Sequence, residues 1–176
     1  MPASRAGAAA DALGGMEDND AVPPLMAVAR DRDAEVRKAV MQALNNLQDR
    51  RALPAFVGGL SDTNAEVRYH AAEGIGNIEN LRVAPPELIR AMDDANGEVR
   101  HAAAHALGHL KDPASLRALI AHVTDAEVEV RQAVVEALDE FDDPSVAGAL
   151  RTALRDTNAE VRQAAVRALG NRNKSK

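Results

Sequence analysis

Apolar residues recur along this chain at the spacing of a helix, and the same arrangement returns several times. In one copy the apolar residues lie mostly three or four positions apart, at Val99, Ala103, Ala106, Leu107 and Leu110. That spacing places them along one side of a helix, with polar residues on the other side. Each copy is therefore predicted to form an amphipathic helix that buries one face.

The copies are marked by a Val-Arg dipeptide that returns at a nearly constant interval. Its arginines are 31, 32, 31 and 31 residues apart, at Arg37, Arg68, Arg100, Arg131 and Arg162. An aspartate lies six residues before each arginine, at Asp31, Asp62, Asp94, Asp125 and Asp156. A glutamate lies two residues before each arginine, and a leucine or isoleucine lies seven after it. A fixed period of this length indicates an array of structural repeats.

Each repeat is predicted to contain a longer and a shorter helix. Good N-cap residues precede the longer helix in four copies, at Asp33, Asn64, Asn96 and Asn158. A turn follows, twice opened by Asp-Pro, and proline suits the first position of the next helix. The segment 116–123 is a typical candidate for the shorter helix. One extra residue near 83–86 accounts for the single interval of 32.

The segments DRDAEVRKAVMQALNNL, SDTNAEVRYHAAEGIGNI and RDTNAEVRQAAVRALG resemble HEAT-like repeats of the phycobilisome-lyase type. The resemblance implies an all-α fold, a right-handed α-solenoid of about five two-helix repeats plus an N-terminal half-repeat. We expect residues 1–20 to be a partial repeat with a lone helix over 3–16, residues 21–171 to be the array, and residues 172–176 to be a disordered tail. The family resemblance is specific for the fold and does not select one function.

Composition narrows the function classes. The 176 residues carry a formal net charge of −6, no Cys and no Trp, one Tyr and two Phe. No apolar run approaches the ~20 residues of a membrane span, and no signal peptide is evident. We therefore expect a cytoplasmic protein with no disulfides, no membrane partner and no cofactor. The acidic balance makes nucleic acid an unlikely partner.

The recurring arginines and aspartates are interpreted as structural. A residue present in every repeat most simply performs a task that every repeat shares. We expect each arginine to reach loop carbonyls and an aspartate of its own or an adjacent repeat, because its planar fork makes several fixed hydrogen bonds. We name this set of ten residues the ladder.

The residues that vary between repeats are the better candidates for binding. On the longer helices, positions one, five and eight after each arginine are predicted to point away from the apolar stripe, with position nine at its margin, and the candidates are read from positions one, five and nine. By resemblance to HEAT arrays this side is concave. The predicted partner-binding residues are Lys38, Gln42, Tyr69, Glu73, Asn77, His101, His105, His109, Gln132, Glu136, Glu140 and Arg167.

The three histidines raise the question of a metal site. His101 and His105 are four residues apart and could share one ion, with Glu73 and Glu136 as further ligands. Deoxyhypusine hydroxylase, another HEAT-like protein, uses His-Glu dipeptides for its irons, but no His-Glu dipeptide occurs here. We therefore favour a solvated polar groove over a metal site. Three imidazoles there could make binding pH-dependent.

The leading functional hypothesis is a non-catalytic scaffold that binds another protein or peptide in its groove. Tyr69 is the candidate anchor, since aromatic residues dominate binding hot spots. The acidic run 136–144 favours a basic partner. His70, where other repeats have Ala, is interpreted as a partly buried histidine with a hydrogen bond. The alternatives are a bilin lyase-like chromophore-handling protein or a metal-dependent HEAT enzyme using groove His and Glu residues. Self-association through the end repeats is also plausible.

Overall fold

The structure, a computed structural model, describes residues 21–172, and within that range every regular element is a helix. The chain divides into two compact units, residues 1–81 (unit 1) and residues 82–176 (unit 2). The helix predicted over residues 3–16 and the tail from residue 173 onward lie outside the described residues.

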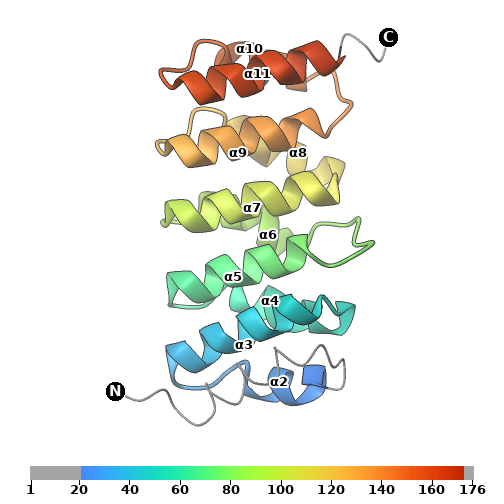
Figure 1. The fold of residues 1–176 in the computed structure, drawn as a ribbon, viewed down its shortest axis with the longest axis vertical. Helices are drawn as coiled ribbons and strands as arrows, with labels where there is room; N and C mark the ends of the chain where they lie inside the picture. Colours follow the sequence, from blue (N-terminus) through green and yellow to red (C-terminus); the bar gives the residue numbers. More distant parts are fainter. Residues whose placement is uncertain (1–20, 173–176) are drawn as a thin grey trace. The chain divides into compact units, whose positions relative to one another are not determined.

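Unit 1 places two long helices side by side, with the short helix α4 behind them and the short helix α2 next to α3 (Figure 1). The long helices are α3 (Ala34–Leu47) and α5 (Ala65–Gly76). The short helices are α2 (Val22–Val28) and α4 (Leu53–Gly59), the latter preceded by a 3-10 turn, η2 (Arg50–Ala52). Each repeat of this unit thus pairs one short with one long helix, as the sequence predicts.

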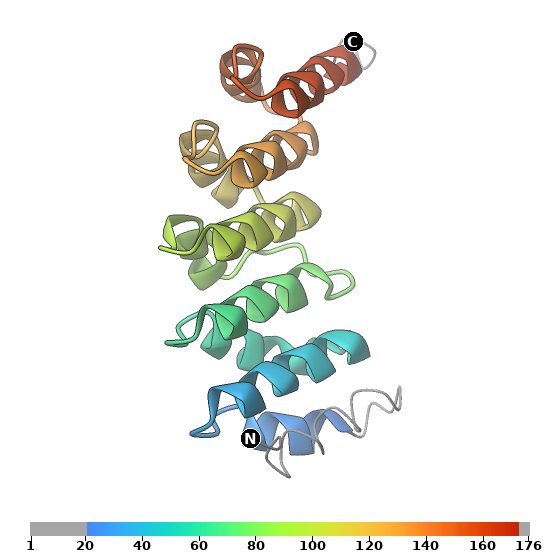
Figure 2. The ribbon, with the colours of Figure 1, turned by 60° about the vertical axis from the view of Figure 1, so that its left-hand side comes forward.

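Unit 2 repeats this two-layer arrangement, with α7, α9 and α11 as its long helices (Figure 2). The long helices are α7 (Gly97–Leu110), α9 (Val128–Asp139) and α11 (Ala159–Arg172). The short elements are α6 (Pro86–Arg90), η3 (Ala91–Asp93), η4 (Pro113–Ser115), α8 (Leu116–Ala121) and α10 (Val146–Ala153). Within residues 21–172, no helix combines the length and the apolar character that crossing a membrane requires.

The long helices begin where the sequence predicts. The side chains of Asp33, Asn64 and Asn96 each accept a hydrogen bond from the backbone N–H two residues later, and Asn158 does the same for Glu160. These caps satisfy backbone donors that the first helical turn leaves free, so the predicted N-caps are confirmed.

One predicted helix boundary was wrong by two residues. The shorter helix predicted over 116–123 ends as α8 at Ala121. The last described helix, α11, includes Arg172, whose guanidinium donates to the backbone carbonyls of Phe141 (2.7 Å) and Asp143 (2.7 Å). These contacts hold the last residue of α11 against the turn between α9 and α10.

Small residues let the helices approach closely at two places. In unit 1 the ring of Phe56 on α4 fills the space where a Cβ at Gly74 on α5 would lie. In unit 2 a Cβ at Gly108 on α7 would lie 2.9 Å from the Ala137 Cα on α9, so only glycine fits at this backbone separation. The rest of the core consists of Leu, Val, Ile, Met and Ala side chains.

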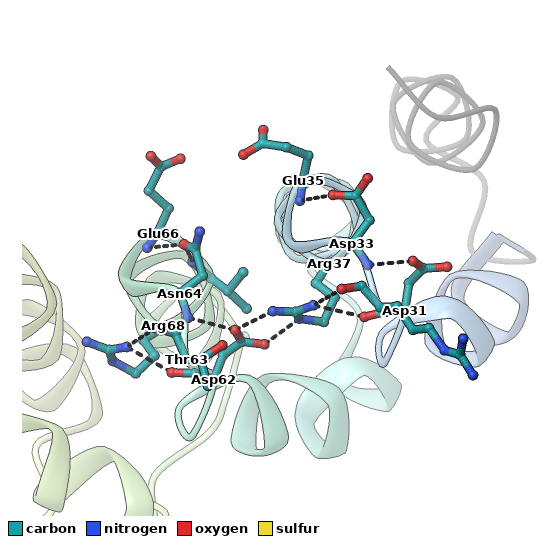
Figure 3. Close-up of polar contacts among 11 residues, drawn as sticks. Asp31, Asp33, Glu35, Arg37, Asp62, Thr63, Asn64, Glu66 and Arg68 are labelled. Carbon is teal, nitrogen blue, oxygen red and sulfur yellow. Dashed lines mark hydrogen bonds and ion pairs between the residues drawn. The ribbon is translucent and has the colours of Figure 1, made fainter. Parts of the chain in front are cut away.

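The ladder residues of unit 1 join the two repeats of that unit (Figure 3). Arg37 donates through Nε (2.6 Å) and Nη2 (2.7 Å) to the two carboxylate oxygens of Asp62 in the following repeat. Its Nη1 donates to the carbonyl oxygen of Asp31 in its own loop (2.9 Å). One guanidinium therefore ties the start of α3 to the loop before it and to the loop before α5.

Unit 2 contains the same contacts in two successive steps. Arg100 donates to both oxygens of Asp125 (2.9 and 2.8 Å), and Arg131 donates to both oxygens of Asp156 (2.7 and 3.0 Å). In each pair, hydrogen bonding by the aspartate contributes to a raised arginine pKa. We call each of these arginine–aspartate pairs a rung. The rungs are bidentate and largely shielded from solvent, which distinguishes them from ordinary surface ion pairs.

Candidate binding faces on the long helices

The predicted partner-binding residues all lie on the long helices or at their ends, and none of their side chains is buried. Those of unit 1 are on α3 and α5, and those of unit 2 are on α7, α9 and α11. We call the two sets the unit 1 face (Lys38, Gln42, Tyr69, Glu73, Asn77) and the unit 2 face (His101, His105, His109, Gln132, Glu136, Glu140, Arg167).

Three side chains of the unit 1 face and the neighbouring His70 form one chain of hydrogen bonds centred on Glu73. The Tyr69 hydroxyl donates to Glu73 Oε1 (2.8 Å), and His70 Nδ1 lies 3.0 Å from Glu73 Oε2. A carboxylate only accepts, so Nδ1 carries the proton, and His70 Nε2 is then free to accept from the Gln42 amide at 2.9 Å. Glu73 is thus fixed by two donors from its own helix, and α5 is linked to α3.

Lys38 occupies the beginning of the same face. Its ammonium group lies 2.6 Å from a Glu35 carboxylate oxygen and 2.9 Å from one of Glu66. Hydrogen bonds to Glu35 and Glu66 hold the pKa of Lys38 above its usual value. The positive charge of this lysine is therefore already matched by two carboxylates.

The unit 2 face begins with the histidine row on α7. The His101 and His105 rings are in edge-to-face contact, with centroids 4.6 Å apart. Burial lowers the pKa of His105, the charge of His101 lowers it further, and Glu136 on α9 opposes these effects. His105 is therefore mainly neutral near pH 7, whereas His109 is exposed to solvent.

The middle and end of the unit 2 face carry carboxylates. The Gln132 amide donates to Glu136 Oε1 (3.0 Å), four residues further along α9. Glu140 forms an ion pair with Lys111 at 2.5 Å. Arg167 lies exposed on α11. The face is thus richer in hydrogen-bond acceptors than in cations.

The sequence reasoning missed a second, shorter set of cross-repeat contacts. The Asn77 amide donates to Asn45 Oδ1 (2.9 Å) in unit 1, and the Asn171 amide donates to Asp139 Oδ2 (2.9 Å) in unit 2. Both pairs are 32 residues apart, and in each the acceptor lies eight positions after the ladder arginine of its repeat. In each pair the donor lies nine positions after the ladder arginine of the next repeat. Comparing these two positions between successive repeats would have predicted both contacts.

Within residues 21–172, no group of three or more His, Cys, Asp or Glu side chains is arranged to hold a metal ion. Of the four residues considered for that role, His101, His105 and Glu136 lie in unit 2, and Glu73 lies in unit 1. Glu73 accepts one hydrogen bond on each of its oxygens, from Tyr69 and from His70.

The helix pairs, their period and the bidentate rungs define a helical repeat protein. The family model of HEAT repeats matches residues 2–63, 57–128 and 119–176. The chain therefore belongs to the HEAT repeat family, and its fold class is the all-helical α-solenoid of several repeats.

Solved structures agree with this fold. A designed armadillo repeat protein in complex with the peptide (KR)4 has a TM-score of 0.73 and 22% identity, covering 94% of this chain and 92% of that one. The CpcE–CpcF complex of phycocyanin lyase from Nostoc sp. PCC7120 has a TM-score of 0.75 and 24% identity, covering 85% of this chain and 64% of that one. An engineered protein has a TM-score of 0.68 at 20% identity, covering 98% and 93%.

At these identities the likeness is one of fold, so the similarity to the lyase carries no activity to this chain. Among curated protein sequences, none matches this chain.

Proposed function

We propose that this chain is a non-catalytic scaffold that binds a Lys/Arg-rich segment of another protein on the exposed faces of its long helices. The observation that carries the proposal is the way Glu73 is held. Its two oxygens accept from Tyr69 and His70, yet its side chain remains 34% exposed. A carboxylate has about four acceptor positions, so two remain for a cation of the partner.

Fixing the carboxylate in advance favours binding. A partner that meets a free glutamate must also immobilise it, whereas Glu73 is already immobilised by its neighbours. The Tyr69 ring beside it offers a surface for the aliphatic or cationic part of a lysine or arginine side chain. Tyr69 is therefore retained as the predicted anchor of the unit 1 face.

The unit 2 face supports the same class of partner with different residues. Glu136 is oriented by Gln132, and Asp139 by Asn171. The designed armadillo protein that binds a Lys/Arg peptide shows that a scaffold of this fold class accommodates such a ligand. The net charge of −6 adds a general attraction for cations.

The test is a titration of a fluorescein-labelled peptide of four Lys-Arg pairs, followed by fluorescence anisotropy at low and physiological salt. Glu73→Gln and Glu136→Gln are each expected to weaken binding about tenfold, which corresponds to the loss of one charge-assisted contact. Tyr69→Ala is expected to weaken it by a similar factor, because aromatic anchors contribute strongly at interfaces.

Two control variants remove the same charge elsewhere. Glu79→Gln in unit 1 and Asp142→Asn in unit 2 change exposed acidic residues off the long-helix faces. If they weaken the peptide as much as the face variants do, the attraction is only that of net charge, and the proposed faces are wrong. An absence of peptide binding would also reject the basic partner.

Several finer points belong to this proposal. We infer that the array functions without a cofactor, that nucleic acid is not its partner, and that it acts in the cytoplasm, consistent with its acidic charge and lack of Cys. The predicted division into residues 1–20, the array and the tail stays a prediction. Self-association through the end repeats is a separate interaction from peptide binding.

A further inference from the structure

Asn96, the N-cap of α7, is the only asparagine of the sequence that is followed by glycine. Its side chain accepts hydrogen bonds from the backbone N–H groups of Glu98 (2.9 Å) and Val99 (3.1 Å). Its backbone carbonyl accepts from the N–H of Arg100 at 3.2 Å, and Gly97 is the first residue of the helix. The side-chain amide of Asn96 is thus followed by a backbone nitrogen whose residue has no side chain.

Two other long helices have the same kind of cap with a different residue after it. Asn64 accepts from the N–H groups two and three residues later at 2.8 and 3.3 Å, and Asn158 does so at 2.8 and 3.2 Å. They are followed by Ala65 and Ala159. These three asparagine caps share one set of contacts, and only the cap of α7 precedes a residue without a Cβ.

The packing of the next repeat leaves no room for a side chain at Gly97. A Cβ there would lie 2.8 Å from the Cγ of Glu127, the residue that precedes α9. Glu127 occupies the N-cap position of α9, but its side chain accepts no capping hydrogen bond. That side chain lies against the start of α7 instead, so the glycine belongs to the contact between these two repeats.

We propose that Asn96 is a site of spontaneous deamidation, since asparagine is one of the chemically labile residue types. The Gly97 backbone nitrogen loses its proton to hydroxide and attacks Asn96 Cγ. A C–N bond forms, the bond from Cγ to Nδ2 breaks, and ammonia leaves with a proton taken from water, which regenerates hydroxide. Water then opens the succinimide ring. Breaking the new bond from nitrogen to Cγ gives aspartate, whereas breaking the bond from nitrogen to the main-chain carbonyl carbon gives isoaspartate.

The start of α7 controls the rate of this reaction. The capping hydrogen bonds hold the Asn96 side chain in place, so the attack requires the first turn to open. Arg100 opposes that opening, because its Nη1 donates to the carbonyl oxygen of Asp94 (2.8 Å) while its Nε and Nη2 donate to Asp125 (2.9 and 2.8 Å). The rate therefore depends on the free energy of local opening at this rung.

The two products affect the repeat differently. The aspartate product keeps the cap, as Asp33 does at the start of α3, and its negative charge is favourable beside the first turn of a helix. The isoaspartate product routes the main chain through the Cβ and lengthens it by one carbon, which displaces the cap from its donors. Isoaspartate at this position is therefore expected to loosen the Arg100–Asp125 rung.

The test is incubation of the full chain at mildly alkaline pH, followed by peptide mapping with mass spectrometry. Asn96 is expected to deamidate at least about tenfold faster than Asn64 and Asn158, because glycine presents no Cβ to the attack. Gly97→Ala is expected to slow the reaction to the rate at Asn64. Gly97→Ala combined with Glu127→Ala is expected to do the same without the steric conflict, and isoaspartyl methyltransferase labels the isoaspartate product.

A second pair of variants tests the control by local opening. Arg100→Gln is expected to speed the reaction at Asn96 at least about threefold, whereas Arg37→Gln, which removes an equivalent rung in unit 1, leaves it unchanged. Circular dichroism checks that all variants stay helical. Equal rates at the three caps, a fast reaction that survives Gly97→Ala, or a folded chain that keeps Asn96 intact while the urea-unfolded chain reacts would overturn the proposal. An unchanged rate in Arg100→Gln would reject the control by the rung.

Discussion

Unit 1 and unit 2 differ in the core of one repeat: the second repeat of unit 1 departs from the leucine and alanine that unit 2 has at the equivalent positions and that the first repeat of unit 1 has as Leu25 and Ala43. Unit 1 has Phe56 six residues before Asp62 and Gly74 six residues after Arg68. Unit 2 has leucine and alanine at the equivalent positions, as in Leu119 and Ala137. Phe56, Leu119 and their counterparts Leu88 and Leu150 are all fully buried.

The difference shows that the two substitutions depend on each other. The Phe56 ring occupies the volume that an alanine Cβ would need at Gly74. A large and a small residue thus replace two of intermediate size, which conserves the packed volume. The arginine–aspartate pairs of the ladder, by contrast, are the same in both units. These polar contacts between repeats therefore vary less within the chain than the apolar contact of Phe56 with Gly74 does.

The largest expected effect is that of removing the ring. Phe56→Ala leaves a cavity in unit 1 and is expected to lower the free energy of unfolding by about 3–5 kcal/mol. Urea denaturation measures the loss, and amide hydrogen exchange locates it in α4 and α5. A loss below about 1 kcal/mol would mean that the ring contributes little packing, contrary to its burial.

Gly74→Ala is expected to cost about 1–3 kcal/mol through overpacking against Phe56, although alanine is the better helix former. Adding Phe56→Leu converts unit 1 to the Leu/Ala pair of unit 2. The double variant is therefore expected to be at least about 1 kcal/mol more stable than the sum of the single effects predicts. Strict additivity would contradict the coupling.

The ladder is expected to respond alike in both units. Arg37→Gln in unit 1 and Arg131→Gln in unit 2 each leave a largely buried aspartate without its bidentate donor, at a cost of about 1.5–3 kcal/mol. Arg117→Gln, an exposed arginine on α8, is the control and should change the unfolding free energy by less than about 0.5 kcal/mol. Unequal effects in the two units would show that the rungs are not equivalent.

The smallest expected effect is a pH dependence of the melting temperature that arises from His105 in unit 2. The pKa of His105 in unit 2 is lowered by burial, by His101 and by His109, against the opposing charge of Glu136. A lowered folded-state pKa contributes stability above the unfolded value of 6.5, and this stability is lost as the pH falls through the folded value. The melting temperature is thus expected to fall slightly between pH 7 and 5. His105→Gln should reduce that slope, whereas an unchanged slope would assign it to other groups.

The sequence predicted the helix pairs and the starts of the long helices because the same pattern recurs in every repeat. The N-caps at Asp33, Asn64 and Asn96 followed from residue type and spacing alone. The Phe56–Gly74 contact was not predicted, because the packing of a ring against the next helix depends on the distance between backbones. That distance is set by the whole core and not by either residue.

The candidate binding residues lie on the long helices or at their ends and none is buried, but their mutual contacts were not predicted. The hydrogen bonds around Glu73 depend on the rotamers of Tyr69 and His70 and on the approach of Gln42 from α3. The sequence alone does not determine which rotamers these side chains adopt. Whether these residues bind a partner rests on the peptide titration.

In the three bidentate arginine–aspartate pairs described in the two units, the partners are separated by 25 residues. An insertion or deletion of a few residues within one of these stretches would move an aspartate out of reach of its arginine. Loss or duplication of a whole 31-residue period would keep each pair intact. Gene rearrangements that add or remove complete repeats should therefore survive in such a protein more readily than small changes of length inside one.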